Sequence, residues 1–236
     1  MSTSYFNTPG MVTVPKEITP QVEALLDRLQ VDYDPELIPV QPEAYSQPDA
    51  CYDNVAEKVK RDGGKLHYGW AVWQSKHIIE AEHYAVWEHA NGDLVDVSPN
   101  RLEATTIMFI PDDQPINNDL MAIPNVRVNI SGSKLIDDFI LLSETVDKIY
   151  GLSIYTDEDK LWLPESVLAT VDTLNQYRLG AEQLYMSGGK AEGPCYCGSK
   201  KTYKACHGRG IKLLTEDIVK RAQMVVRQEW MNRQQA

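Results

Sequence analysis

The segments LHYGWAVWQ (66–74), HIIEAEHYAVWEH (77–89), DLVDVSP (93–99) and ATTIMFIP (104–111) decide the fold. Each is rich in β-branched and aromatic residues and is bounded by turn residues, which is typical of short strands. The tripeptide NGD at 91–93 is a strong hairpin signal. We therefore expect three or four antiparallel strands between Leu66 and Ile110.

A helix is expected immediately before this meander. Cys51, Val55 and Val59 are spaced i, i+4 and i+8, and Gly63 with Gly64 forms a natural stop. Asp49 is placed to cap the start of this helix. One helix followed by an antiparallel meander predicts the α+β class.

The flanking sequence predicts one more short helix and two irregular stretches. Thr19-Pro20 opens a helix, because proline is favoured at the first helical position, and residues 22, 25, 26 and 29 form its apolar face. Residues 31–50 contain four prolines and are interpreted as an extended, ordered loop. Residues 1–18 look irregular, and the chain is expected to be loop-like again from Pro111 to about Ser133.

The C-terminal half is expected to be helical. Helices are predicted at 134–150, 164–186 and about 215–232, and SGGKAEGP (187–194) has the composition of a linker. We predict three parts: an α+β domain at 1–130, a helical segment packing on it at 131–187, and a small metal-binding motif with a last helix at 188–236.

Composition indicates a globular protein. The chain has 236 residues, of which 43% are hydrophobic and 24% charged. No run approaches the roughly 18–20 apolar residues of a membrane span, and the N-terminus shows no signal-peptide pattern. We therefore expect a cytoplasmic protein without membrane contact. Thiols stay reduced there, so clustered cysteines indicate metal binding or catalysis.

Charge is unevenly distributed. The net charge is −11, yet residues 188–236 hold ten Lys/Arg against four Asp/Glu, a net of +6, and the other 187 residues carry −17. The acidic body argues against broad nucleic-acid binding. The basic C-terminal part leaves three interpretations: a solvated surface, contact with an acidic partner, or nucleic-acid binding.

The stretch GPCYCGSKKTYKACHG (193–208) holds three of the four cysteines. Cys195, Cys197, Cys206 and His207 follow the spacing C-x-C-x8-C-H and offer four donors, which is what tetrahedral zinc requires. With four protein ligands the site has no open position, so we expect one structural Zn²⁺ ion. The alternative is a reduced thiol cluster or a disulfide.

This stretch resembles the SEC-C motif, the zinc-binding tail of the preprotein translocase motor SecA. The matching positions are Pro194, Cys195, Cys197, Gly198, Ser199, Tyr203, Lys204, Cys206 and His207. The departure is Lys200, where the family often has glycine. In SecA the motif binds the chaperone SecB. The resemblance implies a protein or peptide partner here without fixing which one.

The fourth cysteine raises the question of catalysis. Cys51 stands at the start of a predicted helix, where the free N–H groups favour a thiolate. His83 is the candidate base, and Asp96 on the return strand is the candidate group that orients it. His89 is a rival base, and His67 and His77 are weaker ones. The alternative is that Cys51, His83 and Asp96 are ordinary structural residues.

The order of these residues resembles the transglutaminase-like and papain-like enzymes. His83, Trp87, Gly92, Asp96 and Pro99 follow that superfamily's order. The resemblance implies acyl-transfer chemistry by Cys51, His83 and Asp96, through hydrolysis, deamidation or transamidation. The competing hypothesis is a non-catalytic adaptor that binds a protein through the zinc motif. Nucleic-acid binding is the least expected function.

Overall fold

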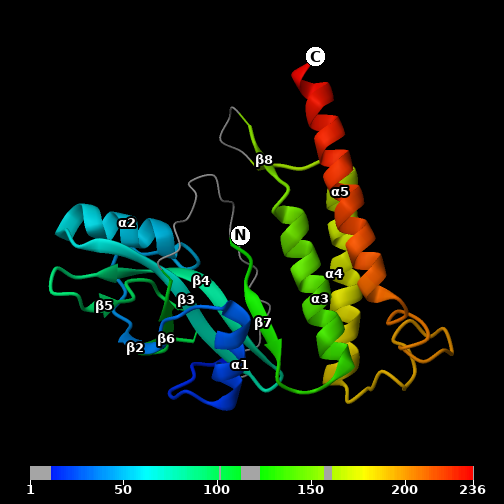
Figure 1. Cartoon of the computed structure of the whole chain (residues 1–236), viewed down its shortest axis with the longest axis horizontal. Helices are drawn as coiled ribbons and strands as arrows, with labels where there is room; N and C mark the ends of the chain where they lie inside the picture. The colour runs from blue at the N-terminus through cyan, green and yellow to red at the C-terminus, as the bar shows by residue number, and fades with distance from the viewer. Residues whose placement is uncertain (1–11, 101, 113–122, 157–160, 236) are drawn as a thin grey trace. The chain divides into compact units, whose positions relative to one another are not determined.

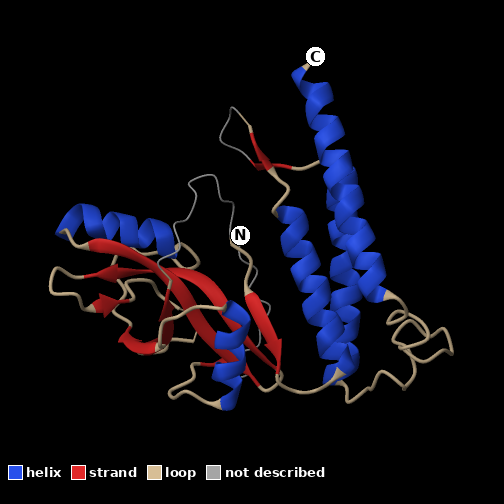
Figure 2. Cartoon of the chain, in the orientation of Figure 1, coloured by secondary structure: helices blue, strands red, loops and turns tan. Residues whose placement is uncertain are grey.

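The computed structural model describes residues 12–100, 102–112, 123–156 and 161–235. The chain divides into two compact units, Met1–Ile130 and Ser131–Ala236. The larger sheet lies in the first unit, and the long helices lie in the second (Figure 2). This is the predicted α+β class.

The first unit contains two helices and the strands of one antiparallel sheet. In chain order its elements are β1 (Val12–Thr13), α1 (Pro20–Leu29), β2 (Glu36–Pro39), α2 (Cys51–Asp62), β3 (Lys65–Ser75), β4 (Ile78–Glu88), β5 (Leu94–Val95), β6 (Thr106–Pro111) and β7 (Val126–Asn129). The strand order is β2-β6-β3-β4-β5, with β1 beside β3 and β7 beside β4.

The long hairpin of β3 and β4 forms the centre of this sheet (Figure 1). Directly opposed residues share a face, as Trp70 and His83 do, and successive residues of a strand point to opposite faces. The outer edge of β4 is shared by two short strands. β7 pairs with residues 78–81 and β5 with residues 87–88, so that among the described residues no strand pairs with residues 82–86 on that side.

Helices α1 and α2 bury the apolar residues that the sequence placed on one face. Val22 and Leu25 of α1 pack with Val72 and Ala81 of the hairpin. Val55 of α2 packs in a second cluster that includes Ala85 and Trp87. Thr19 caps α1 by accepting a hydrogen bond from the Val22 N–H, in line with the predicted helix start.

Three strands lie where irregular chain or loops were predicted. The first is β1, Val12–Thr13, which falls within residues 1–18 and pairs with β3. Residues 36–39, inside the proline-rich stretch, form β2 and pair with β6, because an edge strand tolerates Pro39. Residues 126–129 form β7, inside the stretch interpreted as loop. β7 is short, and its charged residue Arg127 is buried in an ion pair. The strand therefore lacks the usual alternation of apolar and polar residues. Of the stretch 1–18 that was predicted to be irregular, residues 1–11 lie outside the described part.

The second unit is helical. It contains α3 (Lys134–Tyr150), β8 (Ile154–Tyr155), β9 (Leu161–Trp162), α4 (Glu165–Met186) and α5 (Ile211–Gln234). The first two helices have the predicted bounds within one residue, whereas α5 begins at Ile211 rather than Thr215. Leu142, Val146, Val171, Leu174 and Val226 are buried together between the three helices. In the described ranges, no helix combines the length and the apolar character needed to cross a membrane.

A buried ion pair joins β4 and β7. Arg127 Nε lies 2.8 Å from Glu80 Oε1, and both side chains are 2% exposed. Asn125 Nδ2 donates a hydrogen bond of 2.8 Å to the same carboxylate oxygen. Burying an ionised group has a large desolvation cost, so the buried charges of Glu80 and Arg127 each depend on the presence of the other.

Replacing Arg127 by methionine should therefore destabilise the first unit by about 3–5 kcal/mol, since it leaves the Glu80 carboxylate buried without its cation. Chemical denaturation followed by fluorescence measures this loss. The matched control is Lys60→Met, which removes an exposed cation from α2 and should change stability by less than about 0.5 kcal/mol. Equal effects of the two substitutions would contradict the interpretation.

Candidate metal centre

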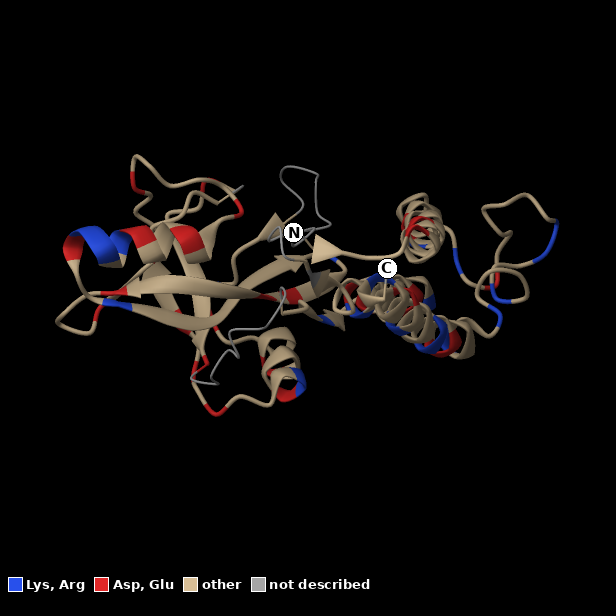
Figure 3. Ribbon diagram, turned by 90° about the horizontal axis from the view of Figure 1, so that it is seen from above, with Lys and Arg blue, Asp and Glu red and all other residues tan. Residues whose placement is uncertain are grey.

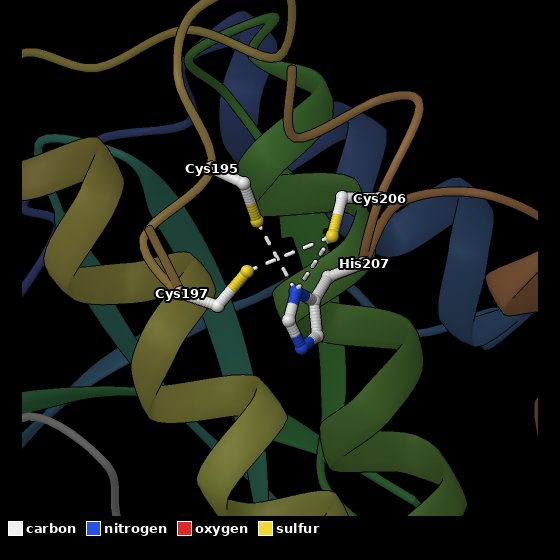
Figure 4. A group of neighbouring side chains, drawn as sticks. All are labelled: Cys195, Cys197, Cys206 and His207. Carbon is white, nitrogen blue, oxygen red and sulfur yellow. Dashed lines mark hydrogen bonds between the residues drawn. The ribbon is translucent and has the colours of Figure 1, made fainter. Parts of the chain in front are cut away.

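Four side chains converge in the segment between α4 and α5 (Figure 4). Cys195, Cys197, Cys206 and His207 each offer one donor atom, and all four atoms lie within 4.8 Å of one another. The His207 donor is Nδ1, which lies 3.1 Å from Cys195 Sγ and 3.6 Å from Cys206 Sγ. The structure therefore brings the four predicted donors to one point.

The spacing of these atoms fits a tetrahedral ion better than a disulfide. Zn–S bonds of about 2.3 Å and Zn–N bonds of about 2.0–2.1 Å place neighbouring donors about 3.5–3.8 Å apart. Cys197 Sγ and Cys206 Sγ are 3.6 Å apart, well beyond the S–S bond of about 2.05 Å. All four cysteines of the chain are free thiols. Three thiols and one imidazole form a donor set that suits zinc.

Tight turns bring the two ligand pairs together. Pro194 and Thr202 form an antiparallel bridge, and Cys195 N–H donates to the Lys201 carbonyl at 2.9 Å. The turn after the first pair uses two left-handed residues, Gly198 at φ +73° and Lys200 at φ +61°. Glycine adopts this conformation without strain, whereas lysine does so at a cost. The one departure from the SEC-C pattern therefore falls at a position that favours glycine.

The metal-binding segment is anchored to the helices of its own unit. Tyr203 is 1% exposed, and it shares an apolar cluster with Cys195, with Leu135 of α3 and with Ala181 of α4. The Tyr203 N–H donates to the Gly193 carbonyl at 3.0 Å. The segment thus has a small core of its own, which continues into the helical core.

The thiols differ in their environments. Burial raises the pKa of Cys195, whereas hydrogen bonds from Ser199 lower the pKa of the exposed Cys197 to about 7. A metal ion binds the thiolate form, so binding must release protons from these groups. Metal affinity is therefore expected to fall as the pH is lowered.

Cys51, the proposed nucleophile, begins α2 as predicted, but its thiol is 8% exposed. Burial raises its pKa to about 12, and the nearby carboxylates of Glu82 and Asp96 act in the same direction. The backbone of Ala85 acts in the opposite direction and lowers the pKa of this thiol. Cys51 shares an apolar cluster with Ala85, and it therefore lies beside the part of β4 whose outer edge has no neighbouring strand in the described part of the chain.

His83, the proposed base, contacts the residue after Cys51. The Tyr52 hydroxyl lies 2.6 Å from His83 Nδ1 and 3.1 Å from the His83 carbonyl oxygen. The imidazole also stacks on Tyr68 and meets Trp70 edge-on at 4.9 Å. Burial lowers the pKa of His83 to about 4, so the ring is neutral at pH 7.

Asp96, the proposed orienting group, is fully buried, and its hydrogen-bond partners are residues other than Cys51 and His83. It accepts hydrogen bonds from the Tyr84 hydroxyl at 3.3–3.4 Å and from the Ser98 N–H at 2.9 Å. Tyr84 and His83 are neighbours on β4 and so point to opposite faces. The hydrogen bonds that the structure shows for the described residues do not join Cys51, His83 and Asp96 into a relay.

Tyr52 and Tyr84, which contact His83 and Asp96, are not among the site residues predicted from the sequence. Strand parity shows that Tyr84 and His83 point to opposite faces of the sheet. The sequence therefore allowed the expectation that Tyr84 contacts a different set of residues. The sequence did not allow such an expectation for Tyr52, because its contact with His83 depends on how α2 packs against β4. Burial raises the pKa of both tyrosines, so both hydroxyls stay protonated.

Comparison with known proteins identifies one feature. The model of the SEC-C motif family matches residues 194–209, which include the four converging donors. The match covers a short segment and describes that segment alone. No curated protein and no solved structure matches the chain. The comparisons support the SEC-C resemblance and give no support to the transglutaminase-like one.

Lys200→Gly should tighten metal binding by about fivefold, because it relieves about 1 kcal/mol of left-handed backbone strain in the folded segment. Competition with a chromophoric chelator measures the change. Lys201→Gly is the matched control: it removes the same charge at a residue without a positive φ. A gain as large for Lys201→Gly would show that charge, not backbone strain, is responsible.

Cys51 should react with iodoacetamide much more slowly than an ordinary thiol, and its rate should keep rising with pH up to its pKa of about 12. His83→Ala should leave the rate unchanged. Mass spectrometry of the metal-loaded protein, which protects the other three cysteines, measures both rates. Rapid labelling at neutral pH that His83→Ala abolishes would instead support the Cys51, His83 and Asp96 hypothesis.

Proposed function

We propose that this protein is a non-catalytic adaptor whose SEC-C segment, folded around one structural Zn²⁺ ion, binds an acidic segment of a partner protein. The observation that carries the proposal is a basic surface on the metal-binding segment. Protein–protein recognition of this kind depends on complementary charge, which sets specificity and the rate of association.

The metal site supports a structural rather than a catalytic role. Three cysteines and one histidine fill the four positions of a tetrahedral ion and leave none for water or substrate. Such an ion supplies folding free energy to a segment that has few buried side chains. The thiolate ligands require a reducing compartment, and we therefore place the protein in the cytoplasm.

The basic surface is built from side chains on both sides of the metal ligands. Residues 190–212 contain six lysine or arginine residues and one acidic residue, Glu192. All six are exposed, and they lie on the loops around the metal site and at the start of α5 (Figure 3): Lys190, Lys200, Lys201, Lys204, Arg209 and Lys212. A surface of one sign attracts a partner of the other sign.

An acidic protein segment fits this surface better than a nucleic acid does. Binding of single strands relies on exposed aromatic rings on which bases stack. In residues 190–212 the aromatic rings are those of Tyr196, which is half-buried, and Tyr203, which is buried. The charge of −17 on residues 1–187 would also repel a long polyanion.

The acyl-transfer hypothesis has less support from the geometry. A thiol nucleophile needs a lowered pKa and a base within hydrogen-bonding reach. Burial instead raises the pKa of Cys51 to about 12 and lowers that of His83 to about 4. Tyr52 contacts His83 Nδ1, and Tyr84 contacts the Asp96 carboxylate.

The zinc-loaded protein should bind a labelled oligoglutamate peptide, and a chelator should abolish the binding. The double variant Lys200→Glu/Lys201→Glu should weaken binding about five- to thirtyfold, since each of the two reversed charges changes the interaction by about 0.5–1 kcal/mol. Fluorescence anisotropy measures the affinity. Lys60→Glu/Lys65→Glu, which reverses two exposed charges of the first unit, is the matched control.

Equal weakening by both double variants would contradict a docking surface on the metal-binding segment. Tighter binding of a single-stranded RNA oligonucleotide than of the peptide would overturn the choice of partner. Metal analysis provides an independent check of the ligand set. A stoichiometric zinc content that survives Cys206→Ser and His207→Ala together would refute it.

A further inference from the structure

The histidine ligand is held by aromatic rings that come from two different parts of the second unit. Because His207 Nδ1 faces the cysteine sulfurs, its other ring edge points away from the metal position. The Tyr196 ring lies 4.5 Å from the imidazole at an interplanar angle of 31°. The Tyr177 ring meets it edge-on at 5.1 Å and 78°.

These two tyrosines have different origins. Tyr196 stands between Cys195 and Cys197 in the metal-binding segment, whereas Tyr177 belongs to α4. The SEC-C match covers residues 194–209, so Tyr177 lies outside it. The environment of the metal ligand therefore extends beyond the motif into the preceding helix.

Helix α4 is shaped to receive the segment at this point. Gly180 lies three residues after Tyr177, so the two residues share a helix face. A Cβ at Gly180 would lie 2.4–2.8 Å from atoms of the Tyr196 ring, closer than real contacts allow. The glycine thus lets the Tyr196 ring pack directly on the helix backbone, beside the ring of Tyr177.

We propose that Tyr177 is a positioning residue of the metal site: its ring holds the His207 imidazole with Nδ1 facing the metal, and it thereby couples metal binding to the packing of α4. Residues behind a metal ligand fix its orientation, and their loss commonly weakens metal affinity by about 10–100-fold. The usual partner of a histidine ligand is a hydrogen-bond acceptor. Here aromatic packing serves the same purpose, and edge-to-face pairs favour one relative orientation.

The coupling must act in both directions. If the packing of α4 favours metal binding, then bound metal favours the packing of α4 to the same extent. Cys195 and Tyr203 already share an apolar cluster with Leu135 and Ala181 of the helices. The metal would therefore stabilise the helical unit around Tyr177, and not merely the loop that contains its ligands. This inference concerns the site itself and does not depend on the partner.

Zn²⁺ affinity measured by competition with a chromophoric chelator tests the role of the ring. Tyr177→Leu, which keeps an apolar side chain, should lower the affinity at least tenfold, and Tyr177→Phe should preserve it. Leu179→Ala, at an exposed position of the same helix, is the control and should have no effect. Circular dichroism verifies that each variant retains its helices.

An affinity of Tyr177→Leu equal to that of the unmodified protein would overturn the proposal, and so would an equal loss in Tyr177→Phe. Amide hydrogen exchange of the unmodified chain supplies a second readout. Chelation should deprotect α4 around residues 177–181 and leave β3 and β4 unchanged. Unchanged protection of α4 would show that the segment and the helix are independent, which excludes the coupling.

Discussion

The outer edge of β4 shows the constraint on which much of the first unit depends, namely that a buried polar group must have a partner. β4 is bordered by β7 at one end and β5 at the other, and no strand that the structure describes lies beside the backbone between them. The first turn of α2 lies there: the Tyr52 hydroxyl donates to the His83 carbonyl at 3.1 Å, and Cys51 packs in the same apolar cluster as Ala85. Unpaired backbone groups at a buried edge cost free energy, so this contact gives Cys51 and Tyr52 a structural reason to be where they are.

The same constraint explains the polar residues on either side of that gap. Glu80 and Arg127 are buried as a pair, and Asp96 is buried with hydrogen bonds from Tyr84 and Ser98. Burial raises the pKa of Asp96 to about 7, because the ionised carboxylate is less stable inside the unit than it is in water. The sequence therefore contains an acid, an imidazole and a thiol, but each of them satisfies a hydrogen-bonding or packing requirement of the sheet.

The elements with strong local signals were predictable from sequence, and the tertiary pairings were not. The bounds of α2 followed from the spacing of Cys51, Val55 and Val59 and from Gly63, because helix periodicity and stop signals are local. β2 and β7 were missed, since each has four residues and is defined by a partner strand far along the chain. The four metal donors were recognisable because they lie within thirteen residues and their types suit one ion. Tyr177 gave no such signal, because its contact with His207 arises only when α4 packs against the segment.

The two kinds of cysteine in this chain show that the groups around a buried thiol, and not its burial alone, decide its chemistry. Cys51 is buried among apolar side chains with carboxylates nearby, which favours the neutral thiol and opposes any reaction that needs a thiolate. Cys195 is as deeply buried, but it lies within reach of two further thiols and an imidazole, so a cation bound among them would stabilise its thiolate. The difference lies in what surrounds each sulfur rather than in exposure. We therefore expect thiolates to form where a metal ion can compensate their negative charge. That place is the segment that also carries the basic surface.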